Sequence, residues 1–341
     1  MGSLLAQGWL AGAEEEIRVL DEASVSLVRE AVRRLGGAAG LSSEAVEQLA
    51  TAASELAHNQ RKHARFGVIG LRAVVRAGVA GLEVIAADEG QGIADPVAAF
   101  SGELRPAGAG LGVGLASAYR LADELDVDVR RGEGTCVWVR KFAAPVARQE
   151  IAVLSRPCAG EAASGDHAAF VRLDDTLVLG VVDGLGHGAP AREAADVAIA
   201  TLRAGAADTP AEILATTDHA LERTRGGVMS VVRFDAHTRT LEHAGAGNVA
   251  TKLYRQGTGA TFLNAARVLG ARHQPVRIPV ENVKLAGEAT LLMFSDGLTT
   301  RTDLSGRLDL LRQPPLVIAH ELLGRFGRSD DDALVLVARL R

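Results

Sequence analysis

The sequence predicts an α+β protein made of two units that follow one another along the chain. Residues 14–143 show two helical patterns early and one late, which we expect to lie on an antiparallel sheet as an α/β two-layer sandwich. Residues 151–341 contain many short β-like runs interrupted by helical stretches, which is typical of a β-rich core with helices on its outer faces. A chain of 341 residues is long enough for two such cores, and we expect the linker between them at 144–150.

The composition narrows the class of protein. Hydrophobic residues make up 48% and charged residues 23% of the chain, as in a folded globular protein. A net charge of -5 and the lack of long Lys/Arg runs argue against nucleic-acid binding. No apolar stretch approaches the length of a membrane span, and the N-terminus lacks the basic start of a signal peptide. Since Cys136 and Cys158 form neither a disulfide framework nor a metal-ligand pattern, we expect a cytoplasmic protein.

Two helices are expected early in the first unit. Residues 24–37 carry apolar residues at helical spacing and end in a Gly pair, which we interpret as a C-cap. Residues 42–64 repeat this spacing, with Ser42 or Ser43 as the N-cap. A third helix is expected at 115–125, after a glycine-rich loop. The expected strands of this unit are 68–75, 81–88 and 135–142.

The second unit is expected to be mostly β. Two helical patterns, at 191–205 and 211–225, interrupt its strands. The expected strands are 167–173, 176–183, 226–235, 240–247, 289–297 and 331–340.

Acidic residues stand where strands of the second unit begin or end. Four such residues are Asp166, Asp183, Asp296 and Asp331. One Asp–Gly pair after a strand indicates no more than a turn, but four acids beside buried strands indicate a cluster. Clustered carboxylates repel one another and raise one another's pKa, and a bound divalent cation offsets this repulsion. Oxygen ligands without cysteine favour Mg²⁺ or Mn²⁺, and the missing Cβ of Gly184 would let a backbone carbonyl approach the ion.

The second unit carries a set of motifs that together resemble a known family. The segments "SGDHAAFVR", "VVDGLGHG", "GGVMSVVRFD", "GAGNV", "FSDGL" and "DDALVLVAR" occur in the order and spacing of RsbX-like members of the SpoIIE-type, metal-dependent (PPM) Ser/Thr phosphatases. The resemblance implies a PPM-type α-β-β-α sandwich that hydrolyses protein phosphoserine or phosphothreonine with two Mn²⁺ or Mg²⁺ ions. It implies that Asp183 is catalytic and that the metal ligands are Asp166, Asp183, Asp296, Asp331 and the carbonyl of Gly184.

Three further residues of these motifs have less defined roles. Asp332 stands where the family often has Asp or Asn. His187 could donate a proton to a phosphate oxygen as a general acid, or it could only order its turn, which is the interpretation we favour. Asn248 is similarly open, while His167, His243 and His273 are interpreted as ordinary histidines.

The first unit contains a polar helix face and a glycine-rich loop. Glu55, Asn59 and His63 are spaced four apart, which places them on one face of a helix; a solvated face would explain this as well. "DEGQGI" follows an expected strand, and "GAGLGVGL" opens a helix, where backbone amides can surround phosphates. The glycine pattern alone is weak evidence, and it is not a Rossmann fingerprint, because the Asp precedes the glycines.

These three elements, in this order, resemble the GHKL (Bergerat) ATP-binding fold of RsbT-like anti-sigma-factor serine kinases. The resemblance implies ATP with Mg²⁺, with Glu55 as the base that activates a substrate hydroxyl, Asn59 as the metal ligand and Asp88 bonded to the adenine amino group. The other implied nucleotide-site residues are Gly90, Gly92, Gly110, Gly112, Gly114 and Thr135. "RPAGAGLG" lacks the hydroxyl residue and part of the glycine run that often precede this loop, so nucleotide binding is better supported than phosphotransfer.

Three functional hypotheses follow. RsbT-like kinases and RsbX-like phosphatases act on the same kind of partner, a STAS-domain antagonist, so the chain could both set and reset one phosphorylation switch. Alternatively, the first unit only binds nucleotide and regulates or docks the phosphatase. In a third hypothesis the protein is a non-catalytic docking module, although a scaffold would not need the four metal-site acids.

Overall fold

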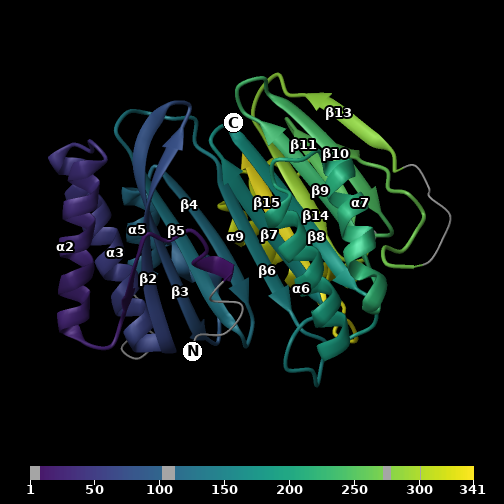
Figure 1. Ribbon diagram of the computed structural model, residues 1–341, viewed down its shortest axis with the longest axis horizontal. Coiled ribbons are helices and arrows are strands. Elements are labelled where there is room, and N and C mark those ends of the chain that lie inside the picture. The colour runs from purple at the N-terminus through teal and green to yellow at the C-terminus, as the bar shows by residue number, and fades with distance from the viewer. Residues whose placement is uncertain (1–7, 102–111, 272–277, 300) are drawn as a thin grey trace. The chain divides into compact units, whose positions relative to one another are not determined.

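A computed structural model describes residues 8–101, 112–271, 278–299 and 301–341 (Figure 1). The chain divides into two compact units, Met1–Ala152 and Val153–Arg341. None of the described helices is both long and apolar enough to cross a membrane.

The first unit is a layer of helices on an antiparallel sheet, as expected. Its strands lie in the order β1-β2-β3-β5-β4, and α3 packs on the sheet beside α2 and α5 (Figure 1). The strands are β1 (Glu15–Arg18), β2 (Ala64–Arg76), β3 (Val79–Gly90), β4 (Glu124–Arg130) and β5 (Gly134–Phe142). The helices are α2 (Glu22–Ala38), α3 (Ser43–His63), α4 (Pro96–Ser101) and α5 (Gly112–Leu121).

The cap predictions for the first two helices had different outcomes. The Ser42 side chain accepts a hydrogen bond from the Ala45 amide at 3.2 Å, so Ser42 and not Ser43 is the N-cap of α3. The predicted Gly-pair C-cap of α2 is wrong, since the helix continues to Ala38. Gly36 is instead a point of close approach, because a Cβ there would lie 3.1 Å from the Val46 side chain. The left-handed residue after the helix is Gly40, at φ +78.

The predicted helix at 115–125 is too long, because α5 ends at Leu121 and β4 begins at Glu124. The alternation of acids with apolar residues along 124–130 is a strand pattern that the helical interpretation missed. Its acids are buried and paired. The Arg140 guanidinium donates to Asp126 at 2.6 Å, and Arg76 donates to Glu124 at 3.0 Å.

The second unit is a sandwich of two sheets between helices, which confirms the predicted α-β-β-α arrangement. One sheet has the order β13-β10-β9-β8-β7, and the strands of the other follow the order β6-β15-β14-β11-β12. Helices α6 and α7 pack on the first sheet and α9 packs on β15 (Figure 1). The helices are α6 (Ala189–Ala204), α7 (Pro210–Ala220), a 3₁₀ turn η1 (Leu221–Arg223), α8 (Leu308–Leu311) and α9 (Pro315–Phe326).

All six expected strands of this unit are present, and four others were not anticipated. The expected ones are β7 (Asp166–Leu173), β8 (Thr176–Gly184), β9 (Gly227–Asp235), β10 (Thr240–Ala246), β14 (Ala289–Phe294) and β15 (Ala333–Leu340). The others are β6 (Glu150–Arg156), β11 (Ala250–Arg255), β12 (Thr258–Thr261) and β13 (Val280–Lys284).

A small polar cluster links the two sheets inside the sandwich. Ser230 on β9 lies 2.9 Å from the His243 Nε2 atom of β10 and 2.8 Å from the Thr251 hydroxyl of β11. His243 is fully buried, and its ring lies 4.7 Å from the ring of Phe262, centroid to centroid. Burial lowers the pKa of His243 to about 4, so the folded protein holds this ring neutral.

This neutral histidine predicts an acid-dependent loss of stability. The pKa of His243 is lower in the folded than in the unfolded chain, so stability is retained above about 6.5 and lost as the pH falls from 6.5 towards 4. The contribution is on the order of 3 kcal/mol. Chemical denaturation between pH 7 and 4 should show a shallower loss in His243→Leu than in wild type. The exposed His219 provides the control, since His219→Leu should follow wild type. Equal pH profiles for wild type and His243→Leu would contradict this prediction.

Candidate active sites

The β7–β8 pair places two of the predicted acids side by side. Asp166 is the direct register partner of Asp183, so both side chains emerge on the same face of the sheet. Asp296 follows β14 and Asp331 precedes β15, and these two strands are antiparallel neighbours. The structure therefore brings the four acids of distant sequence segments to one end of the sandwich.

Hydrogen bonds fix several of these carboxylates. The buried Ser295 hydroxyl donates to Asp166 Oδ2 at 2.5 Å and accepts from the Leu334 amide at 3.0 Å. The Asn248 amide donates to Asp296 Oδ2 at 2.7 Å, which gives Asn248 the positioning contact that its sequence left open.

Asp332 has a different role from its neighbour Asp331. Its two carboxylate oxygens accept from the backbone amides of Cys158, at 2.7 Å, and Gly165, at 2.8 Å. Asp332 thereby holds the loop that leads to Asp166, and both of its oxygens are engaged with the backbone.

Three acids of the cluster, Asp166, Asp183 and Asp331, have raised pKa values. Burial raises the pKa of Asp183 to about 8, and the charges of Asp296 and Asp331 add to the shift. Burial, followed by the charge of Asp183, raises the pKa of Asp166 well above its ordinary range. Burial and Asp296 also raise the pKa of Asp331. Carboxyls that hold protons at neutral pH are a favourable place for a divalent cation, which can take the place of the protons.

The fit of a metal ion rests on the chemistry of these donors. Among the residues that the structure describes, no group of three or more His, Cys, Asp or Glu side chains is placed so that it could hold a metal ion as it stands. The ligand types, all of them oxygen, fit Mg²⁺ or Mn²⁺. Gly184 is required by packing as well, because a Cβ there would lie 2.1 Å from the Ala191 carbonyl oxygen of α6.

The loop after Asp183 is tied to neighbouring segments. Gly186 and Gly188 adopt φ values of +89 and +72, which favour glycine. His187 lies between them, largely exposed, with Nδ1 2.8 Å from a carboxylate oxygen of Glu161. This contact agrees with a role for His187 in ordering the turn.

The other two histidines named alongside His243 differ in what the structure describes. His167 is buried, with Nδ1 3.0 Å from the Ala168 carbonyl oxygen. His273 lies outside the described residues.

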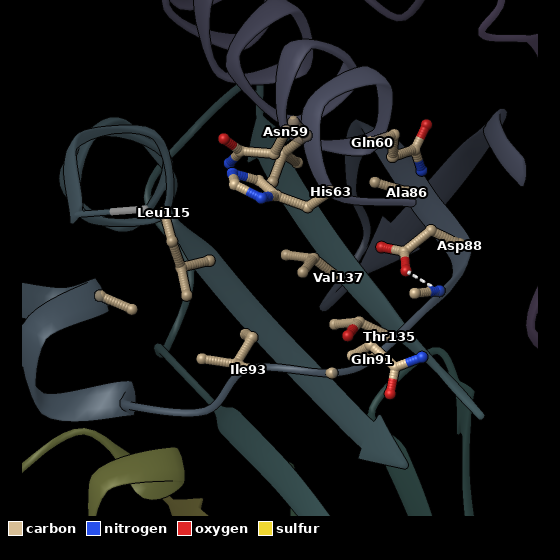
Figure 2. Close-up of a pocket in the computed structure, with 14 residues that line it drawn as sticks. Asn59, Gln60, His63, Ala86, Asp88, Gln91, Ile93, Leu115, Thr135 and Val137 are labelled. Atoms are coloured by element: carbon tan, nitrogen blue, oxygen red, sulfur yellow. Dashed lines mark hydrogen bonds between the residues drawn. The ribbon is translucent and has the colours of Figure 1, made fainter. Parts of the chain in front are cut away.

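The first unit contains a pocket between α3, α5 and the sheet (Figure 2). Five of the predicted nucleotide-site residues line it: Asn59, Asp88, Gly90, Gly92 and Thr135. Gly114 on α5 packs against Asn59, since a Cβ on Gly114 would lie 2.6 Å from the Asn59 amide nitrogen. Gly112 is the first residue of α5, and Gly110 lies outside the described residues. Glu55, one turn before Asn59 on α3, is not among the residues that line the pocket.

Asp88 is the acid of this pocket. Its Oδ1 atom accepts from the Gly90 amide at 2.8 Å, as the dashed line in Figure 2 shows, and burial raises its pKa to about 6. A side chain at position 90 would collide with the carboxylate, because a Cβ there would lie 2.8 Å from Asp88 Oδ1. The Thr135 backbone also hydrogen-bonds to Asp88 and, like the Gly90 amide, works against the rise of its pKa.

Sequence reasoning missed Gln60, which also lines the pocket (Figure 2). Gln60 is 3% exposed, and its amide nitrogen donates to the carbonyls of Val68, at 3.1 Å, and Ala87, at 3.0 Å. These contacts hold α3 against β2 and β3. They lie beside a register shift between Ala64 and Gly67 in the pairing of β2 with β3. A buried glutamine beside Asn59 was visible as a break in the apolar stripe, but its partners are set by the tertiary structure. His63, which also lines the pocket, was predicted to share a helix face with Asn59.

Two family models match the chain. Residues 19–141 match the histidine kinase-like ATPase domain, and residues 173–341 match Stage II sporulation protein E (SpoIIE). The serine/threonine-protein kinase RsbT of Bacillus subtilis (strain 168) is 34% identical over 126 residues, which are 37% of this chain and 94% of RsbT. The chain belongs to the RsbT family. Its first unit is an RsbT-like ATPase domain and its second unit is a SpoIIE domain, which confirms both predicted resemblances.

Two solved structures are similar to part of this chain. A chain from work on the bacterial stressosome, described as a modular system adapted to control secondary messenger signalling, is 28% identical with a TM-score of 0.53. That match covers 57% of this chain and 100% of the other. RsbX in complex with magnesium is 20% identical with a TM-score of 0.51, over 57% of this chain and 96% of RsbX. The likeness to RsbX supports the sandwich fold.

The acid cluster predicts that the metal-free protein loses stability as the pH rises. The folded pKa of Asp183 is about 8, above its unfolded value near 4, so the stability present below pH 4 is lost as the pH rises through 8. Asp183→Asn, which mimics the protonated acid, should be more stable than wild type at pH 8 when both are kept in a chelator. Thermal unfolding from pH 5 to 8 measures this. Asp174→Asn, on the exposed turn between β7 and β8, is the matched control and should follow wild type. Destabilisation of Asp183→Asn at pH 8 would count against the cluster.

The pocket predicts that Asp88 controls nucleotide affinity. Asn at position 88 offers one acceptor oxygen where the carboxylate offers two, so one of the donors to Asp88, a backbone amide or a ligand amine, loses its partner. We expect Asp88→Asn to weaken binding of a fluorescent ATP analogue about tenfold or more. Wild-type affinity should also fall as the pH drops below about 6, because Asp88 then gains a proton. Affinity within twofold of wild type in Asp88→Asn, with unchanged pH dependence, would exclude this role.

Proposed function

We propose that this chain is a bifunctional switch protein that regulates a STAS-domain antagonist in a bacterial partner-switching pathway. The second unit removes phosphate from a phosphoserine or phosphothreonine of the partner, and the first unit binds ATP and transfers phosphate to it. The observation that carries the proposal is the register pairing of Asp166 with Asp183 in a cluster with Asp296 and Asp331, in which the pKa values of Asp166, Asp183 and Asp331 are raised. The RsbT-like domain in the same chain supports the opposing activity.

In the second unit, the proposed ligands of two Mn²⁺ or Mg²⁺ ions are Asp166, Asp183, Asp296, Asp331 and the Gly184 carbonyl. Two such ions would bind a water, lower its pKa and orient it towards phosphorus. The protein's own contribution is to fix the ligands. Ser295 holds the Asp166 carboxylate and Asn248 holds the Asp296 carboxylate, while Asp332 secures the loop before Asp166.

In the first unit, the pocket is proposed to bind ATP with Mg²⁺. Asp88 accepts from the adenine amino group, Asn59 binds the metal ion, and Glu55 takes the proton of the substrate hydroxyl. The residues proposed to shape the adenine pocket and to surround the phosphates are Gly90, Gly92, Gly110, Gly112, Gly114 and Thr135. The carboxylate of Asp88 and the glycine beside it support the adenine end of this proposal.

Phosphate on the partner would act through charge. A phosphorylated side chain gains about 1.5 to 2 negative charges at neutral pH, which is enough to break or create a protein interface. With both reactions in one chain, the same molecule would add the phosphate that changes this interface and remove it again.

A second candidate function keeps only the phosphatase. Glu55 is not among the residues that line the pocket, and the glycine-rich loop lacks the usual hydroxyl residue. These observations favour a first unit that binds nucleotide and regulates the phosphatase without transferring phosphate.

The test uses Asp183→Ala and Glu55→Ala with a purified STAS domain. With Mn²⁺ and the phosphorylated domain, wild type and Glu55→Ala should release phosphate, and Asp183→Ala should release at least a hundredfold less. With Mg-ATP and the unphosphorylated domain, Asp183→Ala should accumulate phosphorylated partner and Glu55→Ala should not. Phosphate release without any transfer would establish the second candidate function. No release from either the STAS domain or a small phosphomonoester would contradict the phosphatase proposal.

A further inference from the structure

The arginine before β9 has no partner of its own. Among the described residues, Arg225 makes no hydrogen bond and no ion pair, and its side chain is exposed. Other arginines near the acid cluster are engaged. Arg192 donates to Asp196 at 2.8 Å, and Arg328 lies 3.4 Å from Asp330.

The fold nevertheless places Arg225 beside the loop that follows Asp183. Gly184 of β8 is the register partner of Gly227 of β9, two residues after Arg225. The Leu185 amide donates to the Gly226 carbonyl at 3.1 Å, which ties the two loops together. The guanidinium lies across Gly186, with Nη1 3.0 Å from the position that a Cβ of residue 186 would occupy. A side chain at 186 would therefore push the arginine away.

The turn that carries Arg225 is itself braced. The Thr224 hydroxyl donates to the Leu221 carbonyl at 2.8 Å and accepts from the Gly226 amide at 3.0 Å. Gly226 has a left-handed φ of +78 and lies so close to Leu269 that a Cβ would be 2.5 Å from its carbonyl oxygen. The backbone of this turn is thus fixed, while no residue that the structure describes pairs with the charged end of Arg225.

Charge balance gives this arginine a reason to be there. Four ionised carboxylates, Asp166, Asp183, Asp296 and Asp331, would offset the charge of two divalent cations. A phosphate dianion approaching this site would then gain little net attraction without a further cation. A guanidinium forms paired, charge-assisted hydrogen bonds to phosphate oxygens, which makes it suited to this role.

We propose that Arg225 binds the phosphate group of the substrate at the mouth of the acid cluster. The inference rests on the proposed phosphatase function and assigns a specificity-determining residue to it. Because Arg225 would contact the phosphate itself, its effect should appear with any phosphomonoester and with free inorganic phosphate, whatever protein carries the group.

The test compares Arg225→Ala and Arg225→Lys in the Mn²⁺-loaded full chain, with p-nitrophenyl phosphate as substrate and inorganic phosphate as a binding probe. Arg225→Ala should raise KM and the dissociation constant of phosphate about tenfold while kcat changes less than about threefold. Arg225→Lys should lie between the two. Arg223→Ala removes an exposed arginine two residues away and should leave both constants within twofold of wild type.

The outcomes separate this inference from the function beneath it. If wild type hydrolyses the substrate but Arg225→Ala has an unchanged KM and unchanged phosphate affinity, the inference fails and the phosphatase proposal stands. If wild type does not hydrolyse the substrate, phosphate binding still decides, because loss of binding in Arg225→Ala alone supports the inference. Equal phosphate binding in wild type and Arg225→Ala, or none in wild type, would overturn it. Matching circular dichroism and melting temperatures show that the variants are folded.

Discussion

Two carboxylates held in register on neighbouring strands are the constraint on which the second unit's site depends. Because Asp166 and Asp183 are direct partners across β7 and β8, neither can leave the other without breaking the ladder between them. The neighbouring groups hold that pair in place. Ser295 donates to Asp166, Asp332 fixes the loop before it, and Gly184 allows α6 to pack directly behind the end of β8. The sandwich thus stabilises an arrangement of like charges that the acids on their own would oppose.

The acid of the first unit's pocket, Asp88, has a different environment. Asp88 accepts from the Gly90 amide and is also hydrogen-bonded by the Thr135 backbone, and burial is the main cause of its raised pKa. A single carboxylate in a pocket can accept from an amine of a ligand, whereas a cluster of carboxylates is suited to cations. Under the proposed function the two units would have complementary chemistry, with an acceptor for a nucleotide base in one and oxygen ligands for metal ions in the other.

Local patterns predicted much of this architecture. The strands next to Asp183 and Asp296 and the helix that carries Asn59 were all predicted, because apolar spacing and an N-cap such as Ser42 are encoded in neighbouring residues. What the sequence concealed depends on distant partners. The pair Gly36 and Gly37 resembles a helix end in the sequence, but both residues lie inside α2. Gly36 is needed there because it packs closely against Val46 of the next helix.

The same limit applies to the sites. The acids could be predicted from their positions at strand ends, but the register that pairs two of them could not. Gln60 and Arg225 belong to no motif, and the carbonyls that Gln60 binds and the loop beside Arg225 reach them only through the fold. The sequence also could not predict that both carboxylate oxygens of Asp332 accept from backbone amides, because Cys158 and Gly165 lie far from it in sequence.

The most direct test of the central claim is a count of the protons released when Mn²⁺ binds. Calorimetric titrations of the metal-free protein at pH 7, in two buffers with different ionisation enthalpies, provide that count. If the acid cluster holds protons until a cation displaces them, wild type should release on the order of one proton or more per chain. Asp183→Asn should release fewer. Binding heats that are the same in both buffers would show that the acids are already ionised, and would contradict the account.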